Sequence, residues 1–325
     1  MPIVSVIMSV YNEPLSWIRQ SVDSILRQSF SDFEFIIVID SPWRDELSRL
    51  LLDYRKADAR IVLLRNDDNI GLTRSLNRGL AQASGRYVAR MDADDISTTD
   101  RLLRQVDFME SHPDVIVLGS RYQPFGRRTL LGWLTNDHWV RLLDIQIKAQ
   151  MLTTSCFVHP SVLIRRSVLV DNGISYDENY RTAQDYRLWE QLHNLGPFAN
   201  LPDRLIRLRT SNRQVSASSS SSQLQARTAI RRRCIEEWLH SIGHSDILGL
   251  PDALSQRKAL RTALAHPRRN PFYRAVMQTF YYSNTRHRLR TMLVALLSGE
   301  IFFFNNAEKL RFVAISFRLK PADIL

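Results

Sequence analysis

The sequence predicts an α/β protein with a mostly parallel central sheet flanked by helices, followed by a C-terminal helical region. Between residue 3 and about residue 120, short apolar runs alternate with amphipathic helical patterns. The apolar runs are continuous, as in strands that are covered on both faces. With 325 residues, of which 44% are hydrophobic, the chain is long enough for one large domain and a smaller one.

The expected strands each carry a run of apolar residues between turn signals. They span 3–10, 33–39, 60–65, 86–91 and 115–119. The expected helices have apolar residues at helical spacing, and they span 18–26, 45–57, 72–84 and 99–112. After residue 120 the sequence becomes loop-rich, and 157–166 then predicts another strand before the helical pattern of 180–196.

The stretch SASSSSSQ, residues 216–223, is of low complexity and predicts a linker. We therefore expect a large α/β domain at 1–215 and a helical region at 216–325. Within that region, 284–320 sets basic residues beside apolar clusters that are too short to span a membrane. Two hypotheses remain open for this segment: it lies on an anionic membrane surface, or it packs as helices on the domain or in a homo-oligomer contact.

The net charge of +11 indicates an anionic partner. Nucleic acid is not expected, because the Arg-rich stretches lack the glycine and aromatic pattern of an RNA-binding sheet. Cys156 and Cys234 match neither a disulfide framework nor a zinc site. The N-terminus has no signal-peptide pattern. We expect a cytoplasmic protein, peripheral on the inner face of the cell membrane.

The stretch RMDADDIS concentrates carboxylates directly after an expected strand. Asp92 and Asp94 alternate along an extended backbone, so both can present oxygen ligands to Mg²⁺ or Mn²⁺ on one side. A calcium loop is excluded, because Ser97 and Leu103 replace the Gly and Glu that it requires. The alternative is a solvated turn in which Asp95 or Ser97 caps the next helix.

Other polar residues follow the first two expected strands. Tyr11 and Glu13 come after the first, and Asp40 comes after the second. Ligands of α/β sheets bind at the carboxyl ends of the strands. We therefore expect these side chains and the acidic cluster to share one edge of the sheet.

Five segments, in this order, resemble glycosyltransferase family 2 with the GT-A fold, a Rossmann-like arrangement found in bacterial polysaccharide and lipopolysaccharide sugar transferases. They are VSVIMSVYNE, the strand-end Asp40, NIGLTRSLNRGLAQASGRYVARMDADD, HPSVLIRRSVL and AQDYRLW. The resemblance covers residues 3 to about 210. It implies transfer of a sugar from a nucleotide-sugar to an acceptor hydroxyl, with inversion and with the help of Mn²⁺ or Mg²⁺.

The resemblance also implies roles for single residues. Asp94 coordinates the metal, and Asp92 contributes to the metal or to the ribose. Asp40 accepts a hydrogen bond from the base, and Arg74 approaches the nucleotide. The residues implied to bind the nucleotide are Ser9, Tyr11, Glu13, Asp40, Arg74 and Asp92.

Asp185, in AQDYRLW, matches the catalytic base of the family. A single displacement needs an ionised carboxylate to take the acceptor proton, and a helix N-terminus favours that form. The alternative is that Asp185 only caps its helix. Gln184 stands where the family often has Glu.

Two positions depart from the family pattern. VIDSPW supplies one acid at Asp40 where two adjacent acids followed by Gly are frequent, and Ser211 in RLRTSN stands near the place of a histidine metal ligand. The ion is therefore expected to rely on Asp94, the diphosphate and water. His159 is interpreted as a packed or acceptor-side residue, because it has no second ligand at metal spacing.

We expect the donor to be a UDP-sugar and the acceptor a lipid-linked or growing glycan. A nucleotidyltransferase is the first alternative, but SVYNEPLSW lacks a Gly-rich phosphate loop. A non-catalytic nucleotide-sugar-binding module is the second, but it has no use for a general base.

Overall fold

The computed structural model describes residues 1–126, 140–210 and 221–249, together with the single positions Ser255, Ala259, Thr262 and Phe272. The chain divides into two compact units, Met1–Ile147 with Ser155–Arg227, and Lys148–Thr154 with the residues from Thr228 on. Ser211 and the basic and apolar segment 284–320 lie outside the described residues. The domain boundary at about residue 215 stays a prediction.

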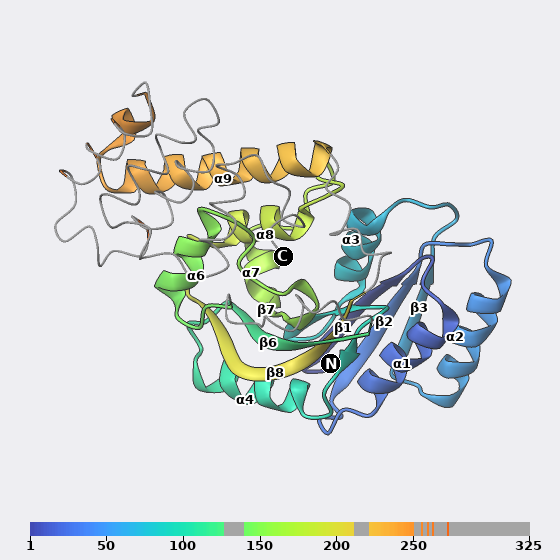
Figure 1. Cartoon of the computed structure of the whole chain (residues 1–325). Helices are drawn as coiled ribbons and strands as arrows, with labels where there is room; N and C mark the ends of the chain where they lie inside the picture. The colour runs from blue at the N-terminus through green and yellow to red at the C-terminus, as the bar shows by residue number, and fades with distance from the viewer. Residues whose placement is uncertain are drawn as a thin grey trace. The chain divides into compact units, whose positions relative to one another are not determined.

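The first unit holds one sheet of eight strands (Figure 1). The strands are β1 Val4–Val10, β2 Phe33–Ile39, β3 Ile61–Arg65, β4 Tyr87–Asp92, β5 Ile96–Ser97, β6 Val117–Gly126, β7 Leu163–Arg165 and β8 Phe198–Thr210. Their order across the sheet is β3-β2-β1-β4-β7-β6-β8-β5.

The helices complete the α/β alternation. They are α1 Leu15–Leu26, α2 Asp45–Ala57, α3 Leu72–Gln82, α4 Arg101–Ser111, α6 Asp144–Met151, α7 Arg166–Asp171, α8 Gln184–Leu192 and α9 Ser221–Ser241, with 3₁₀ turns η2 His159–Ser161 and η4 Ser245–Gly249.

The sheet is mixed. Strands β3, β2, β1 and β4 run parallel, and β6 is parallel to β8. Strand β7 is antiparallel to both β4 and β6, and β5 is antiparallel to β8. The predicted fold class is therefore confirmed, with the parallel pairing concentrated in the N-terminal half, where each strand is followed by a helix.

One face of the sheet packs on α1, α2 and α4. Alternate residues of β1 point to this face, because side chains alternate along a strand, and they are Val4, Val6, Met8 and Val10. The helices contribute buried apolar residues at helical spacing, among them Ile18, Val22, Leu47, Leu51, Leu102 and Val106. These contacts form the main core of the first unit.

Helix α3 packs on the opposite face, against β1 and β2. Its approach to the sheet depends on Gly79, because a Cβ atom there would lie 2.6 Å from Cγ2 of Ile7. The close packing fixes α3 beside the carboxyl ends of the first strands. This position matters for the site described below.

Several elements differ from the sequence-based expectation. Strand β8 and the short β5 were not predicted, and β6 extends to Gly126 into the stretch expected to be loop-rich. The strand expected at 157–166 is a 3₁₀ turn followed by the short β7. The helix expected at 180–196 begins only at Gln184, because Ala183 adopts a left-handed conformation. Residues 221–223 of the expected linker belong to α9.

In the second unit, α9 buries Ile230, Cys234, Ile235 and Leu239, which lie on one helical face. The ring of Trp238 stacks on Phe272, with centroids 5.6 Å apart. Cys156 and Cys234 are both free and buried. Among the described helices, none has the length and apolar character needed to span a bilayer.

Candidate active site

The polar residues predicted to follow the first strands do meet at one edge of the sheet. Ser9, near the end of β1, pairs in register with Asp92 at the end of β4. Tyr11 and Glu13 lie in the turn directly after β1, and Asp40 follows β2, the parallel neighbour of β1. The central strands thus bring residues more than 80 positions apart in the sequence to a common edge.

The carboxylates at this edge are partly buried and lie close enough to repel one another. Burial and the charges of Asp92 and Glu13 raise the pKa of Asp94 to about 7. Burial and the charge of Asp92 also raise the pKa of Glu13, whose carboxylate accepts a hydrogen bond of 2.8 Å from the Tyr11 amide. At the ends of β1 and β4, burial and neighbouring like charges therefore disfavour the ionised forms of Asp94 and Glu13.

The structure excludes the capping hypothesis for Asp95 and Ser97. Asp95 is buried, and its Oδ1 accepts a hydrogen bond of 2.7 Å from the backbone amide of Arg209 on β8. Ser97 belongs to β5 and pairs with Ile206. The next helix, α4, has Asp100 as its N-cap residue. Both candidates are thus used to attach β8 to the acidic turn.

Two arginines at the acidic cluster were missed by sequence analysis. Arg90 on β4 is 3% exposed, and its Nη2 lies 2.5 Å from Oδ1 of Asp92. Arg209 donates from Nε to the Asp94 carbonyl at 2.7 Å, and its guanidinium stacks over the rings of Trp17 and Phe125. An arginine inside an apolar strand, as in RYVARM, was the available signal for the first of them.

The donor set fits a divalent cation that a ligand helps to bind. Asp92, Asp94 and Glu13 offer carboxylate oxygens, the ligands preferred by Mg²⁺ and Mn²⁺. One oxygen of Asp95, Oδ2, is buried without a hydrogen-bond donor among the described residues. In the same ranges no three His, Cys, Asp or Glu side chains form a metal site by themselves. The described carboxylates thus offer suitable ligand atoms but do not make a complete metal site by themselves.

Tyr11 lies at the open side of this edge. Its ring is 44% exposed and meets the ring of Trp43, 59% exposed, edge to face at 6.0 Å. Arg44 holds the two turns together, because its Nη1 donates to the carbonyls of Tyr11 and Glu13 at 2.9 and 3.1 Å. The aromatic pair is thus an ordered, accessible surface suited to a planar base.

Asp40 is buried, and its carboxylate already accepts four hydrogen bonds. Oδ1 accepts from Asn66 Nδ2 and the Ile70 amide at 2.7 and 2.9 Å. Oδ2 accepts from Asn69 Nδ2 and the Gly71 amide at 2.9 and 3.0 Å. A carboxylate commonly accepts about four hydrogen bonds, so these bonds occupy its acceptor sites. They attach the loop before α3 to the end of β2. The predicted contact of Asp40 with a base stays a prediction.

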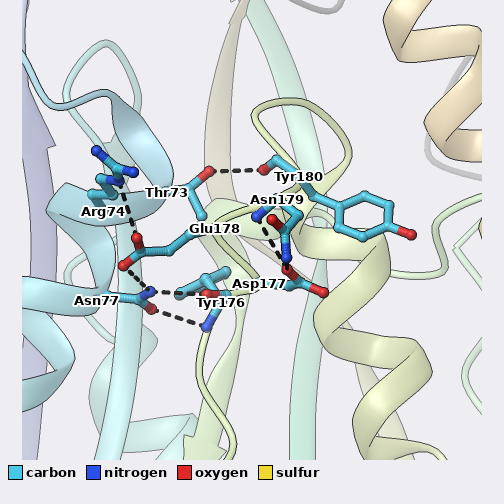
Figure 2. Close-up of polar contacts among 8 residues, drawn as sticks. All are labelled: Thr73, Arg74, Asn77, Tyr176, Asp177, Glu178, Asn179 and Tyr180. Atoms are coloured by element: carbon cyan, nitrogen blue, oxygen red, sulfur yellow. Dashed lines mark hydrogen bonds and ion pairs between the residues drawn. The ribbon is translucent and has the colours of Figure 1, made fainter.

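Arg74 lies in the first turn of α3 and pairs with Glu178, with 3.0 Å between Nε and Oε2 (Figure 2). Both side chains are about half exposed. In this arrangement Arg74 points to the segment that precedes α8. Its approach to a nucleotide stays a prediction.

Asp185 lies in the first turn of α8, two positions after the N-cap residue Ala183. Burial raises the pKa of its carboxyl group, and a hydrogen bond of 2.8 Å from Ser155 Oγ to Oδ2 opposes this shift. The helix N-terminus stabilises the ionised form. Asp92 and Asp185 both act electrostatically on the buried Tyr176, so each carboxylate lies within electrostatic range of that residue.

His159 is packed, as predicted. Its Nε2 lies 2.8 Å from the hydroxyl oxygen of Tyr176, and its ring meets those of Tyr176 and Trp189 edge to face. Burial and the nearby Arg90 hold the pKa of His159 well below its usual value. The imidazole is therefore neutral and belongs to an aromatic cluster beside the site.

The carboxylates and the exposed aromatic pair thus lie at the carboxyl ends of the strands, where α/β proteins bind their ligands. The family model described as "Glycosyl transferase family 2" matches residues 5–173. The chain belongs to this family. The amylovoran biosynthesis glycosyltransferase AmsE of Erwinia amylovora is 29% identical over 233 residues, which cover 70% of this chain and 84% of that relative.

Solved structures of the GT-A fold are similar as well. TarS of S. aureus, in complex with UDP-GlcNAc, has a TM-score of 0.60 at 17% identity, over 85% of this chain and 89% of that one. The mannosyltransferase PcManGT of Pyrobaculum calidifontis, in complex with GDP-Man and Mn²⁺, has a TM-score of 0.58 at 18% identity, over 99% and 86%. At these identities the likeness establishes the fold.

Proposed function

We propose that the protein is an inverting glycosyltransferase that moves a sugar from a UDP-sugar to a hydroxyl of a lipid-linked or growing glycan. Asp185 acts as the general base in this proposal, and a divalent ion binds at Asp94 and Asp92. The observation that carries the proposal is the presence of two separate carboxylate groups, both within electrostatic range of the buried Tyr176. One belongs to the acidic cluster at the strand ends, and the other begins α8.

The two groups are suited to different steps. Burial and like charges disfavour the ionised forms of Asp94 and Glu13 at the ends of β1 and β4, and a metal-bound diphosphate would relieve this. Asp185 stands apart from that cluster, and its raised pKa makes the ionised carboxylate a better proton acceptor near neutral pH. A binding module would need the first group but not the second.

In the proposed reaction, the acceptor oxygen attacks the anomeric carbon from the face opposite the leaving UDP. Asp185 takes the hydroxyl proton as this bond forms, and the bond from the anomeric carbon to the diphosphate oxygen breaks. Ser155 holds the carboxylate through its hydrogen bond to Oδ2. A divalent ion, when bound, supplies positive charge to the leaving diphosphate.

The nucleoside is proposed to bind at Ser9, Tyr11 and Glu13, with its base against the exposed ring of Tyr11. Two similar proteins support the choice of donor and acceptor. TarS binds UDP-GlcNAc, and AmsE acts in amylovoran biosynthesis. PcManGT binds GDP-Man with Mn²⁺, so GDP is the donor nucleotide to be tested against UDP.

The experiment is a screen of UDP-, GDP- and dTDP-sugars with Mn²⁺, in which release of the nucleoside diphosphate is measured without an acceptor and then with lipid-linked glycans. We expect UDP release that requires the metal, and inversion at the anomeric carbon of the product. Stronger binding of GDP than of UDP under identical conditions would overturn the choice of donor. Donor binding without any release or transfer would favour a binding module.

A further inference from the structure

A short segment carries the chain into α8, and helix α3 holds it. We call residues 176–182 the strap. Figure 2 shows that Thr73, Arg74 and Asn77, on one face of α3, all bond to the strap. Asn77 makes two hydrogen bonds to the backbone of Tyr176. Its Oδ1 accepts from the Tyr176 amide at 2.9 Å, and its Nδ2 donates to the Tyr176 carbonyl at 2.8 Å. One side-chain amide therefore satisfies both backbone groups of a strap residue.

The other two contacts differ in strength. Thr73 is 5% exposed, and its Oγ1 donates to the Tyr180 carbonyl at 2.9 Å. The Arg74 and Glu178 side chains are 59% and 49% exposed, and an ion pair so open to solvent contributes little to stability. Among the contacts that α3 makes with the strap, those of Asn77 to Tyr176 and of Thr73 to Tyr180 are therefore the main ones.

The strap is bonded in turn to α8. Oδ2 of Asp177 lies 3.1 Å from Nε of Arg187, and Nη1 of Arg187 lies 2.9 Å from Glu190. Oδ1 of Asp177 accepts from the amide and the side chain of Asn179, which closes a compact turn. A displacement of the strap would therefore move the first turns of α8.

The backbone between the strap and α8 is strained. Ala183 has a φ of 59°, and it is the one non-glycine residue with positive φ in the described part of the chain. This conformation is unfavourable for a residue with a Cβ atom, and it persists only where the surroundings impose it. The direction in which α8 leaves the strap, and with it the position of Asp185, thus depends on the attachments of the strap.

We infer that Asn77 is a positioning residue for Asp185, acting through the strap and supported by Thr73. The inference rests on the proposed function, in which Asp185 takes the acceptor proton. Helix α3 is suited to this task, because Asp40 bonds the loop before it to the carboxyl end of β2. A shift of a catalytic group by about 1 Å can cost 100-fold in rate.

The test compares Asn77→Ala and Thr73→Val with a control, Asn172→Ala. Asn172 lies outside the strap and also loses one bond, from Nδ2 to the Val168 carbonyl. For each variant, kcat and donor KM are measured with a UDP-sugar and Mn²⁺, donor affinity by calorimetry, and amide exchange at residues 184–189. Asn77→Ala is also made in the Asp185→Asn background.

We expect Asn77→Ala to lower kcat by about 10- to 100-fold and to leave donor affinity within about threefold. Thr73→Val preserves the shape of the side chain, and it should lower kcat by a smaller factor than Asn77→Ala does. If Asn77→Ala fails to fold, the result for Thr73→Val tests the inference instead. Both variants should exchange faster at 184–189, and the control should match the wild type. In the Asp185→Asn background, Asn77→Ala should have no further effect.

An unchanged kcat in variants with faster exchange would overturn the inference, as would an equal loss of rate in both backgrounds, which would indicate a merely structural role. A wild-type protein without turnover on any nucleotide-sugar would refute the proposed function instead. The exchange measurement then still decides whether α3 positions the start of α8, since unchanged exchange in both strap variants contradicts it.

Discussion

Replacing Asp94 with Asn should stabilise the metal-free protein at high pH. Burial and the charges of Asp92 and Glu13 raise the pKa of Asp94 from 3.8 to about 7. The folded protein therefore keeps a proton that the unfolded chain releases between about pH 4 and pH 7. The free energy of unfolding falls as the pH rises through this window. The stability that comes from the retained proton is lost above about pH 7, where the folded protein releases it too. The asparagine side chain carries no titrating proton, so the variant lacks this decline.

The magnitude follows from the shift. Each pKa unit corresponds to about 1.36 kcal/mol, so the two units between pH 5 and pH 7 correspond to at most about 3 kcal/mol. The repulsion between Asp94 and Glu13 is already contained in this shift, so it adds nothing further to the gain. Relative to the wild type, Asp94→Asn should therefore gain up to about 3 kcal/mol between pH 5 and pH 8.

Urea unfolding, followed by circular dichroism at pH 5, 6, 7 and 8 with EDTA present, measures this difference. Asp171→Asn, at an exposed position, is the matched control and should show no such trend. With Mn²⁺ and UDP at about 100 times the Kd, the wild type should instead gain about 2.7 kcal/mol and the Asp94→Asn variant little. A difference between variant and wild type that does not change with pH, or that falls as the pH rises, would refute the assignment of charge repulsion to this site.

Three further changes test other parts of the structure. Asp185→Asn should keep donor affinity in calorimetry but lower turnover by about 100-fold or more, and a loss below about tenfold would remove Asp185 as the base. Asp40→Ala leaves four hydrogen-bond donors without their acceptor, so the free energy of unfolding in urea should drop by about 3 kcal/mol or more, and a drop below about 1 kcal/mol would contradict this. Gly119→Ala places a Cβ atom against Oδ1 of Asn200 and should lower the free energy of unfolding by roughly 1–3 kcal/mol, whereas Gly249→Ala, with open space around it, should not.

Local sequence spacing predicted the N-terminal half of the fold well. The expected strand at 33–39 and the expected helix at 45–57 match β2 and α2 residue for residue. In this half each strand is followed by its own helix, so the apolar spacing of each segment is enough to identify it. The same alternation predicted that the residues after β1, β2 and β4 meet at one edge.

The C-terminal half of the sheet depends on partners distant in sequence. Strand β8 pairs with β6, about 80 residues earlier, and contains Pro202 and Asp203, which interrupt any apolar run. Strand β5 has two residues and exists because β8 lies beside it. Neither strand has a local pattern that identifies it, because the stabilisation of each comes from the pairing itself.

The sequence by itself determined which residue types stand at the strand ends and which family the chain resembles. The tertiary structure alone decided how the polar groups are used: the carboxylate of Asp40 attaches a loop, the amide of Arg209 bonds Asp95, and Asn77 binds the backbone of the strap. Periodicity reports which face of an element is buried. The partner of a buried polar group is set by packing over the whole chain, because any donor brought within about 3 Å can satisfy a given acceptor.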